Sequence, residues 1–321
     1  MPHFDSVPQR RLCVAPMMAW TDRHCRYLHR LVAPGALLFT EMVTSGALLH
    51  GPAERLLRYH PLEHPLALQL GGSDPRELAA AARMGAEAGY NEINLNVGCP
   101  SPRVRQGRFG ACLMREPELV RDCMSAIGEA VPVPVSVKCR LGVDEADSDA
   151  LLQRFVATVA ESGCRVFYIH ARKALLNGLS PAQNRTVPPL QYPRAYALKA
   201  QFPKLQFVIN GGIDAVAELD AHLAALDGVM IGRAAYHDPM LLAAMNRHVF
   251  GSACGGVPLD PRGVMDDYLA YMDKELSAGT RLNDMTRHVL GMFAGMPGAR
   301  RFRQILSDAH ALKHNDLALV T

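Results

Sequence analysis

The strongest constraint on the fold of this chain is a series of eight short apolar segments, each ending in Gly, Pro or a polar residue. Segments of this length and composition predict β-strands. They occupy residues 12–17, 36–42, 66–70, 92–97, 135–139, 166–169, 206–209 and 228–231. Because four to seven residues suffice for a strand but not for a typical helix, the series favours a sheet of eight strands.

Segments with helical periodicity separate most of these strands. They occupy residues 21–32, 75–88, 117–131, 148–161, 192–201, 215–225 and 239–250, whereas the gap at 44–61 is less clearly helical. Strands that alternate with helices predict a parallel sheet. Eight such units, with both faces of every strand read as apolar, favour a closed (β/α)8 TIM barrel, and an open doubly wound sheet is the alternative.

The pattern changes after residue 250. Residues 255–258 are typical of a linker, and residues 261–277, 283–291 and 299–312 have helical periodicity. We therefore expect two domains: a TIM barrel at residues 1–250 and a small all-helical C-terminal domain at residues 251–321.

Composition limits the class of protein further. The chain has 321 residues, 49% of them apolar, and it contains neither a signal-like hydrophobic run at residues 1–11 nor about 18 consecutive apolar residues anywhere. We expect a cytoplasmic protein. Its eight cysteines include no C-x-x-C pair, so neither a metal site nor a disulfide framework is expected.

Charge is distributed unevenly along the chain. Residues 162–213 and 99–114 contain no Asp or Glu but many Arg and Lys. Since these stretches lie between predicted strands, we interpret them as a surface that faces a polyanion rather than as a disordered tail.

The predicted strands end in polar residues, which in this fold lie at the active-site end of the barrel. These residues are Glu41, Gln69, Asn94, Asn96, Lys138, His170, Asn210 and Arg233. A ring of hydrogen-bonding groups at that end requires a ligand. Glycines at 211, 212 and 232, next to Arg233, predict a phosphate site after the seventh and eighth strands.

Three residues carry alternative chemical readings. Lys138 could form a Schiff base or supply a fixed positive charge beside a cofactor. His170 could face a ligand or be an ordinary buried histidine. Cys99 could be inert packing, but it follows the fourth strand in a Gly/Pro loop, where a largely protonated thiol could donate a proton or attack.

With these residues identified, the chain resembles the tRNA-dihydrouridine synthase family, and specifically its subfamily A. The resemblance covers nearly the whole chain, in order. The matching segments are APM at 15–17, WTDRHCR at 20–26, TEMV at 40–43, ALQLGGSD at 67–74, EINLNVGCPS at 92–101, GRFGAC at 107–112, HARK at 170–173, INGG at 209–212, GR at 232–233 and PGAR at 297–300.

The resemblance implies that FMN binds in the barrel and that NADPH reduces it. It places Pro16, Met17 and Met18 near the flavin ring, Gln69 on its pyrimidine edge, Lys138 and His170 beside it, and Asn210, Gly211, Gly212, Gly232 and Arg233 on the phosphate. The resemblance further implies that hydride passes from the flavin to C6 of uracil and that Cys99 protonates C5. Members of subfamily A act on positions 20 and 20a of the tRNA D-loop.

For RNA contacts we expect Asn96 to read the uracil edge of an unstacked base. Asn184, Arg185 and Arg300 are further expected contacts. We expect a monomer. The rival readings are an FMN barrel that reduces a free pyrimidine or an enone, a lysine aldolase, and an RNA-binding module that retains only the barrel.

Overall fold

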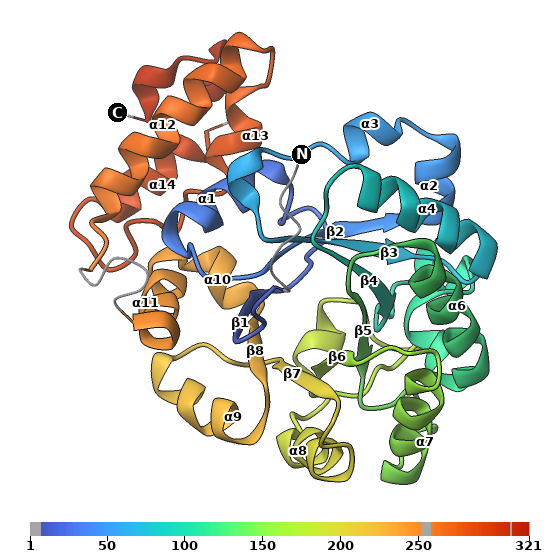
Figure 1. Cartoon of the computed structure of the whole chain (residues 1–321). Coiled ribbons are helices and arrows are strands. Elements are labelled where there is room, and N and C mark those ends of the chain that lie inside the picture. Colours follow the sequence, from blue (N-terminus) through green and yellow to red (C-terminus); the bar gives the residue numbers. More distant parts are fainter. Residues whose placement is uncertain (1–7, 252–257, 309, 321) are drawn as a thin grey trace.

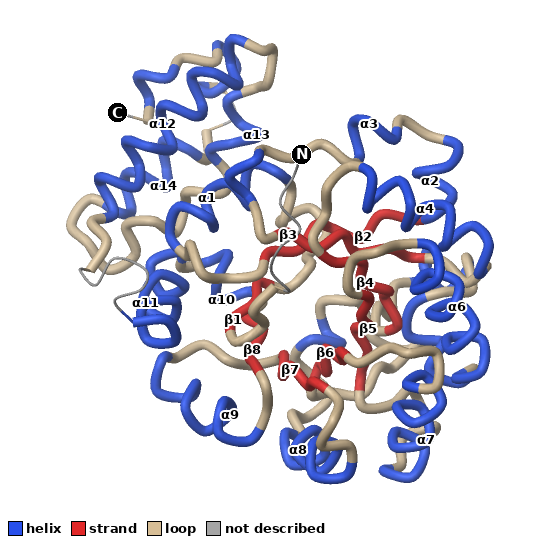
Figure 2. The backbone as a smooth tube through the Cα atoms, viewed as in Figure 1, coloured by secondary structure: helices blue, strands red, loops and turns tan. Residues whose placement is uncertain are grey.

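The computed structural model describes residues 8–251, 258–308 and 310–320. Its centre is a ring of eight parallel strands that helices surround (Figures 1 and 2). The strands are β1 (Leu12–Val14), β2 (Leu38–Thr44), β3 (Leu66–Gly71), β4 (Glu92–Val97), β5 (Val135–Arg140), β6 (Val166–His170), β7 (Gln206–Asn210) and β8 (Gly228–Ile231). The predicted (β/α)8 TIM barrel is confirmed.

Pairing runs in sequence order around the ring, from β2 through β8 to β1. The remaining gap is closed where Cys13 pairs in parallel with Leu37, and the amide of Leu37 donates to the carbonyl of Leu12 over 3.0 Å. The barrel is therefore closed, and the open-sheet alternative is wrong. β1 is shorter than predicted because the chain turns directly after it, with the amides of Trp20 and Thr21 donating to the carbonyl of Met17.

Helices follow most strands and cover the outside of the ring. Those of the barrel are α1 (Arg23–Val32), α2 (Ser45–His50), α3 (Ala53–Leu56), α4 (Pro75–Glu87), α5 (Pro102–Gln106), α6 (Pro117–Ala130), α7 (Asp149–Ala160), α8 (Tyr192–Gln201), α9 (Leu219–Ala225), α10 (Arg233–His237) and α11 (Pro239–Phe250). The unclear gap at 44–61 holds α2 and α3. Pro75, Pro117 and Pro239 each open a helix, where a missing amide hydrogen costs nothing.

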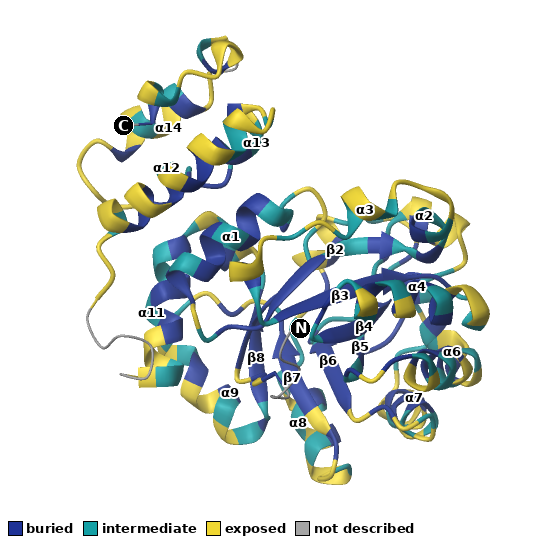
Figure 3. Cartoon of the chain, turned by 45° about the horizontal axis from the view of Figure 1, so that its top comes forward, coloured by how far each residue is buried: buried dark blue, intermediate teal, exposed yellow. Residues whose placement is uncertain are grey.

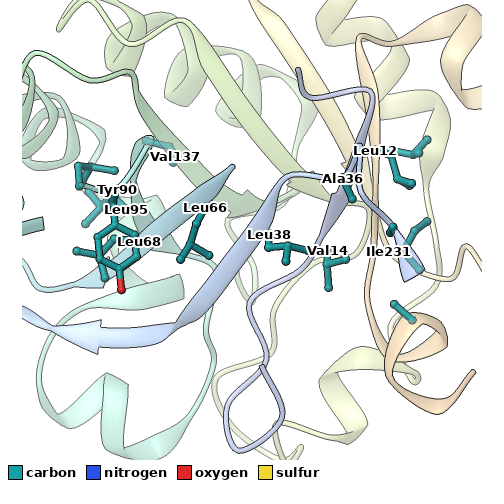
Figure 4. Packing of buried hydrophobic residues seen from close by; sticks show 14 of the residues in the cluster. Leu12, Val14, Ala36, Leu38, Leu66, Leu68, Tyr90, Leu95, Val137 and Ile231 are labelled. Carbon is teal, nitrogen blue, oxygen red and sulfur yellow. The ribbon is translucent and has the colours of Figure 1, made fainter. Parts of the chain in front are cut away.

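The main core lies between the strands and these helices. Outward-facing strand residues such as Leu38, Leu66 and Leu95 are fully buried there (Figure 4). In Figure 3 the strands are buried, whereas the surrounding helices expose their outer faces. None of the described helices is long and apolar enough to cross a membrane.

The inward faces of the strands differ from our expectation that both faces would be apolar. One part of the interior is a small apolar cluster that includes Phe39, Val208 and Met230. On β4, however, Glu92, Asn94 and Asn96 all point inward and are buried. The reason is that side chains alternate along a strand, so the polar residues of EINLNV share the inner face and the apolar ones the outer face.

The chain after α11 forms helices that pack beside α1 (Figure 1). They are α12 (Pro261–Ser277), α13 (Leu282–Thr286) and α14 (Ala299–Leu306). α13 and α14 are shorter than predicted. α14 ends early because the side chain of Asp308 caps the next turn through the amides of His310 and Ala311. Most of the expected linker, at 255–257, lies outside the described residues.

Candidate active site

One cavity of about 640 Å³ opens at the carboxyl ends of the strands, and every strand or the loop after it contributes to its lining. This is where active sites of the fold lie. The cavity brings together nearly all the predicted site residues. They are Pro16, Met17, Met18, Gln69, Asn96, Cys99, Lys138, His170, Arg185, Asn210, Gly211, Gly212, Gly232 and Arg233.

A larger hollow of about 850 Å³ lies at the opposite end of the barrel, where Val135, Val166 and Gln206 begin their strands. We place the site in the smaller cavity, because the chemically versatile side chains converge there and because the fold presents its loops at that end.

Cys99 is held at the cavity by backbone hydrogen bonds. The side-chain oxygen of Asn96 accepts from the amides of Gly98 and Cys99 over 3.1 and 2.9 Å. The carbonyl of Cys99 accepts from Ala111 over 2.9 Å. Gly110 has a φ of +75°, and a Cβ there would lie 2.7 Å from the Cys99 oxygen, so only glycine permits this approach.

Burial raises the pKa of the Cys99 thiol above its ordinary value. Arg140, Arg185 and Lys138 oppose that shift through their positive charges. The thiol is therefore protonated at neutral pH, and the same cations would stabilise the thiolate that remains after it has given up its proton. These are the properties of a general acid.

Lys138 reaches across the cavity to β7, where its ammonium donates to Oδ1 of Asn210 over 3.0 Å. Asn210 is oriented in turn by its own donation to the carbonyl of Met230. Burial, followed by repulsion from Arg140, lowers the pKa of Lys138 to about 8. A substantial part of the lysine population is charged at neutral pH, although no carboxylate among the described residues forms an ion pair with it.

His170 lies against the glycines that follow β7. A Cβ on Gly211 would lie 2.7 Å from Cδ2 of His170. Burial, then repulsion from Arg140 and Lys138, lowers the pKa of His170 well below its ordinary value. The imidazole is therefore neutral at physiological pH and can donate one hydrogen bond and accept another.

Arg140 is a site residue that our sequence analysis missed. It lines the cavity, is only 3% exposed, and donates to the carbonyls of Gly98, Lys173 and Asn184. Burial lowers its pKa to about 10. The signal was present in the sequence, because Arg140 is two residues after Lys138 and so shares its inward face on the strand.

The far side of the cavity has the features of an anion site. Gly211 and Gly212 have φ values of +115° and +73°. Arg233 donates to the carbonyl of Arg185, and burial and the charge of Arg233 lower the pKa of Arg185. Four cations and one carboxylate line the cavity: Lys138, Arg140, Arg185, Arg233 and Asp214. Such a site fits a phosphate group.

Met17 and Met18 lie on the loop after β1, at one rim of the cavity. Thr21 holds this loop by accepting from the amide of Met17 over 2.9 Å. Met18 is 60% exposed, and Trp20 stacks on Tyr236 with a centroid distance of 4.5 Å. The methionines therefore offer apolar surface beside polar groups at the cavity, as a planar heterocycle requires.

Asn184 and Arg300 do not line this cavity. Asn184 is fully buried, and its side chain bonds to both the amide and the carbonyl of Leu175. It therefore shapes the loop that carries the exposed Arg185 and cannot offer its own amide to RNA in this conformation. Arg300 is exposed on α14, outside the barrel.

Two other strand-end residues also lie outside the cavity lining. Glu41 accepts from the amide of Ala19 and thereby holds the loop after β1. Asn94 lies one layer deeper in the barrel, bonded to Gln69 and Ser136.

The acid-free stretches do not form a single surface. Arg165 and Lys204 border the hollow at the opposite end, and Arg194 and Lys199 form ion pairs with acidic residues of other segments. The interpretation of residues 162–213 as one polyanion-facing surface is wrong, because successive parts of a β–α–β unit lie at opposite ends of the barrel. Near the active-site cavity this stretch contributes the exposed Arg185.

A protonated thiol, a half-buried lysine, a neutral histidine and a glycine-rich cradle that fits an anion lie together at one mouth of the barrel, as in the active site of a (β/α)8 enzyme. Residues 13–320 match the family model for dihydrouridine synthase (Dus). The chain belongs to the dihydrouridine synthase family, and it is an enzyme. The aldolase and binding-module readings are thereby wrong.

Several curated proteins are highly similar to the chain. A protein of Xanthomonas axonopodis pv. citri is 56% identical over 299 residues, which cover 93% of this chain and 88% of that protein. Proteins of Vibrio cholerae and Escherichia coli K12 are each 54% identical, covering 93% of this chain and 90% and 86% of their own lengths. All three are named tRNA-dihydrouridine(20/20a) synthase.

Proposed function

We propose that this protein reduces uridines 20 and 20a of the tRNA D-loop to dihydrouridine, with FMN as its flavin and NADPH as the reductant. The observation that carries the proposal is that Cys99, Lys138, His170 and the glycine cradle line one cavity. The relatives that share 54–56% of its residues support the substrate through their names.

The residues present fit FMN. Gly211, Gly212, Gly232 and Arg233 would hold the phosphate, since they combine accessible backbone amides with a guanidinium. Pro16, Met17 and Met18 would contact the ring, and Gln69 would face its pyrimidine edge. When bound, the flavin supplies a hydride to C6 of uracil.

The protein's own groups complete the reduction. The Cys99 thiol donates its proton to C5 of uracil, so that the base gains one hydride and one proton overall. Arg140 and Lys138 stabilise the resulting thiolate through charge. Lys138 would also offset negative charge on the reduced cofactor, which is electrostatic work and needs no Schiff base.

Substrate positioning would be divided between polar and basic groups. Asn96 has a second amide hydrogen that can face the uracil edge. His170, being neutral, can bond to the base or the cofactor without adding charge. Arg103, Arg105 and Arg108, all exposed after Cys99, would hold RNA phosphates together with Arg185.

Recognition of the rest of the tRNA falls to the C-terminal domain at residues 251–321, with Arg300 as a contact, while Asn184 acts through the loop it shapes. We propose that the enzyme works as a monomer in the cytoplasm.

The test is Cys99→Ala compared with Cys112→Ala. Both thiols are partly exposed in neighbouring segments, but Cys112 donates to the carbonyl of Phe109 and does not line the cavity. We expect Cys99→Ala to keep FMN binding and flavin reduction by NADPH, while dihydrouridine formation falls by about 10² to 10⁴. Cys112→Ala should match the parent. Full activity of Cys99→Ala would remove the proposed proton donor.

A further inference from the structure

A continuous line of buried hydrogen bonds crosses the barrel interior, from the amino ends of the strands to the Cys99 loop. It begins at Arg10, two residues before β1, and ends at Asn96. The interior of a (β/α)8 barrel is normally filled with branched apolar residues, and buried polar groups lower stability unless they are fully bonded. The line therefore calls for a functional explanation.

Its lower end is the carboxylate of Glu92, which is 0% exposed. Arg10 donates to Oε2 through two nitrogens, over 2.9 and 2.6 Å. The hydroxyls of Ser136 and Tyr168 both donate to Oε1, over 2.5 and 3.0 Å. A carboxylate accepts only, so Glu92 fixes the direction of every hydrogen bond made to it.

Three side-chain amides continue the line of hydrogen bonds from Ser136 toward the cavity. Because its proton points to Glu92, the Ser136 oxygen accepts from Nδ2 of Asn94 over 2.8 Å. Oδ1 of Asn94 then accepts from Nε2 of Gln69, and Oε1 of Gln69 accepts from Nδ2 of Asn96, each over 2.8 Å.

The upper end requires the same direction. Oδ1 of Asn96 accepts from the amides of Gly98 and Cys99, which can only donate. Both ends therefore agree, and turning any one amide round would bring two donors or two acceptors face to face. Each end alone favours this orientation, and the two ends together raise the cost of every arrangement in which an amide is reversed.

We infer that Glu92, through Ser136, is a positioning residue that orients the amides of Gln69 and Asn96 and so presents the correct donors and acceptors to the flavin and the uracil. This rests on the proposed function, because Gln69 and Asn96 are its proposed ligand-facing residues. Gln69 has one hydrogen and one lone pair left for a ligand, whereas Asn96, whose oxygen already accepts two hydrogen bonds, has one hydrogen left. Glu92, on a different layer of the barrel, acts together with the backbone amides of Gly98 and Cys99 to keep these groups facing the cavity.

The barrel provides a matched pair of variants. Ser136→Ala and Tyr168→Phe each remove one hydroxyl that donates to the same oxygen of Glu92. Only Ser136 also accepts from Asn94, so only Ser136→Ala interrupts the line toward the cavity. Both variants are small buried changes, and thermal unfolding would show that each is folded.

The experiment measures FMN dissociation constants of the apo-proteins and the kcat and KM for tRNA. We expect Ser136→Ala to weaken FMN about tenfold and to lower kcat by a similar factor, while Tyr168→Phe stays within about twofold of the parent. Glu92→Gln, which replaces one of the two acceptor oxygens with a donor NH2 group, should reproduce Ser136→Ala. The lower kcat of Glu92→Gln should persist when the concentration of tRNA is raised.

Equal FMN affinity and kcat in Ser136→Ala and Tyr168→Phe, whether both unchanged or both reduced, would overturn the inference. That result is distinct from failure of the proposed function, in which the parent protein itself would form no dihydrouridine. If Ser136→Ala proved unfolded, an unchanged Glu92→Gln would overturn the inference in the same way.

Discussion

The ammonium of Lys138 on β5 lies 3.0 Å from the side-chain oxygen of Asn210 on β7, across the strand that carries His170. This hydrogen bond holds the lysine beside the glycines that we propose bind a phosphate. Its pKa of about 8 makes its charge sensitive to pH in the range where enzymes are assayed.

FMN affinity should therefore fall above pH 8. Because the pKa of Lys138 in the apo-protein is about 8, raising the pH removes a positive charge that favours the anionic ligand. For one linked proton the loss approaches about tenfold per pH unit. Fluorescence titration of apo-protein with FMN between pH 7 and 9 would measure it. Lys138→Met should bind more weakly and lose most of this slope; a parent curve that is flat over this range would contradict the prediction.

Gly211→Ala should weaken FMN by more than about tenfold. A Cβ at this position would lie 2.7 Å from the His170 ring, and the backbone is in the left-handed region that favours glycine. The matched control is Gly163→Ala, which has a φ of +91° but open space around its Cβ. It should cost about 1 kcal/mol of stability and leave FMN binding unchanged. Equal FMN affinity for the two variants would argue against the glycine cradle.

Salt should weaken tRNA binding steeply, and Arg185→Gln should reduce that dependence. Each phosphate contact releases counterions, so losing one contact lowers the slope of log K against log salt by about 1. Filter binding at 50 to 200 mM salt would report it. Arg165→Gln, at the opposite end of the barrel, is the control with the same change of charge. If both variants shift the slope equally, general charge rather than the cavity rim determines binding.

Asp22→Asn should destabilise the contact between the barrel and the C-terminal helices. Asp22 caps α1 through the amides of His24 and Cys25, and it also bonds to Arg287 and His288 of the C-terminal part. Asparagine keeps the cap but loses the charge, at a cost of about 1–3 kcal/mol. Asp284→Asn, which breaks only the exposed pair with Arg281, should cost under about 0.5 kcal/mol.

The effect of Asp22→Asn should also depend on pH. Burial alone would raise the pKa of Asp22, but the hydrogen bond with His288 and the charge of Arg287 lower it well below its ordinary value. A lowered carboxyl pKa contributes stability above the unfolded-state value near 4, and this contribution is lost as the pH falls below it. In urea unfolding, the difference between parent and variant should shrink from pH 6 to pH 3. A constant difference would show that charge is not its source.

Much of the fold and the site could be predicted because the functional residues of a (β/α)8 barrel lie at the ends of its strands. Asn96, Lys138 and His170 each close an apolar run, and one topology gathers such ends in one place. The positions of α8, α11 and α12 were also predicted to the residue, since proline and glycine mark their limits.

What sequence reasoning missed depends on contacts between strands. Arg10 and Glu92 are 82 residues apart, and neither has a local signal for a buried ion pair. Asn184 reads as a loop residue open to solvent, and only the folded loop shows that Leu175 occupies its side chain. The charge stretch at 162–213 failed for the same reason, because linear charge carries no information about which end of the barrel a residue reaches.

The pairing of Cys13 with Leu37 has a consequence for association between molecules. With β1 bonded to β8 on one side and to Leu37 on the other, each strand of the described ring has a neighbour on both sides. Unpaired edge strands are where proteins add a foreign strand and begin to aggregate. This sheet offers no such template while it is folded, so ordered recruitment of another chain by strand addition would first require β1 to detach.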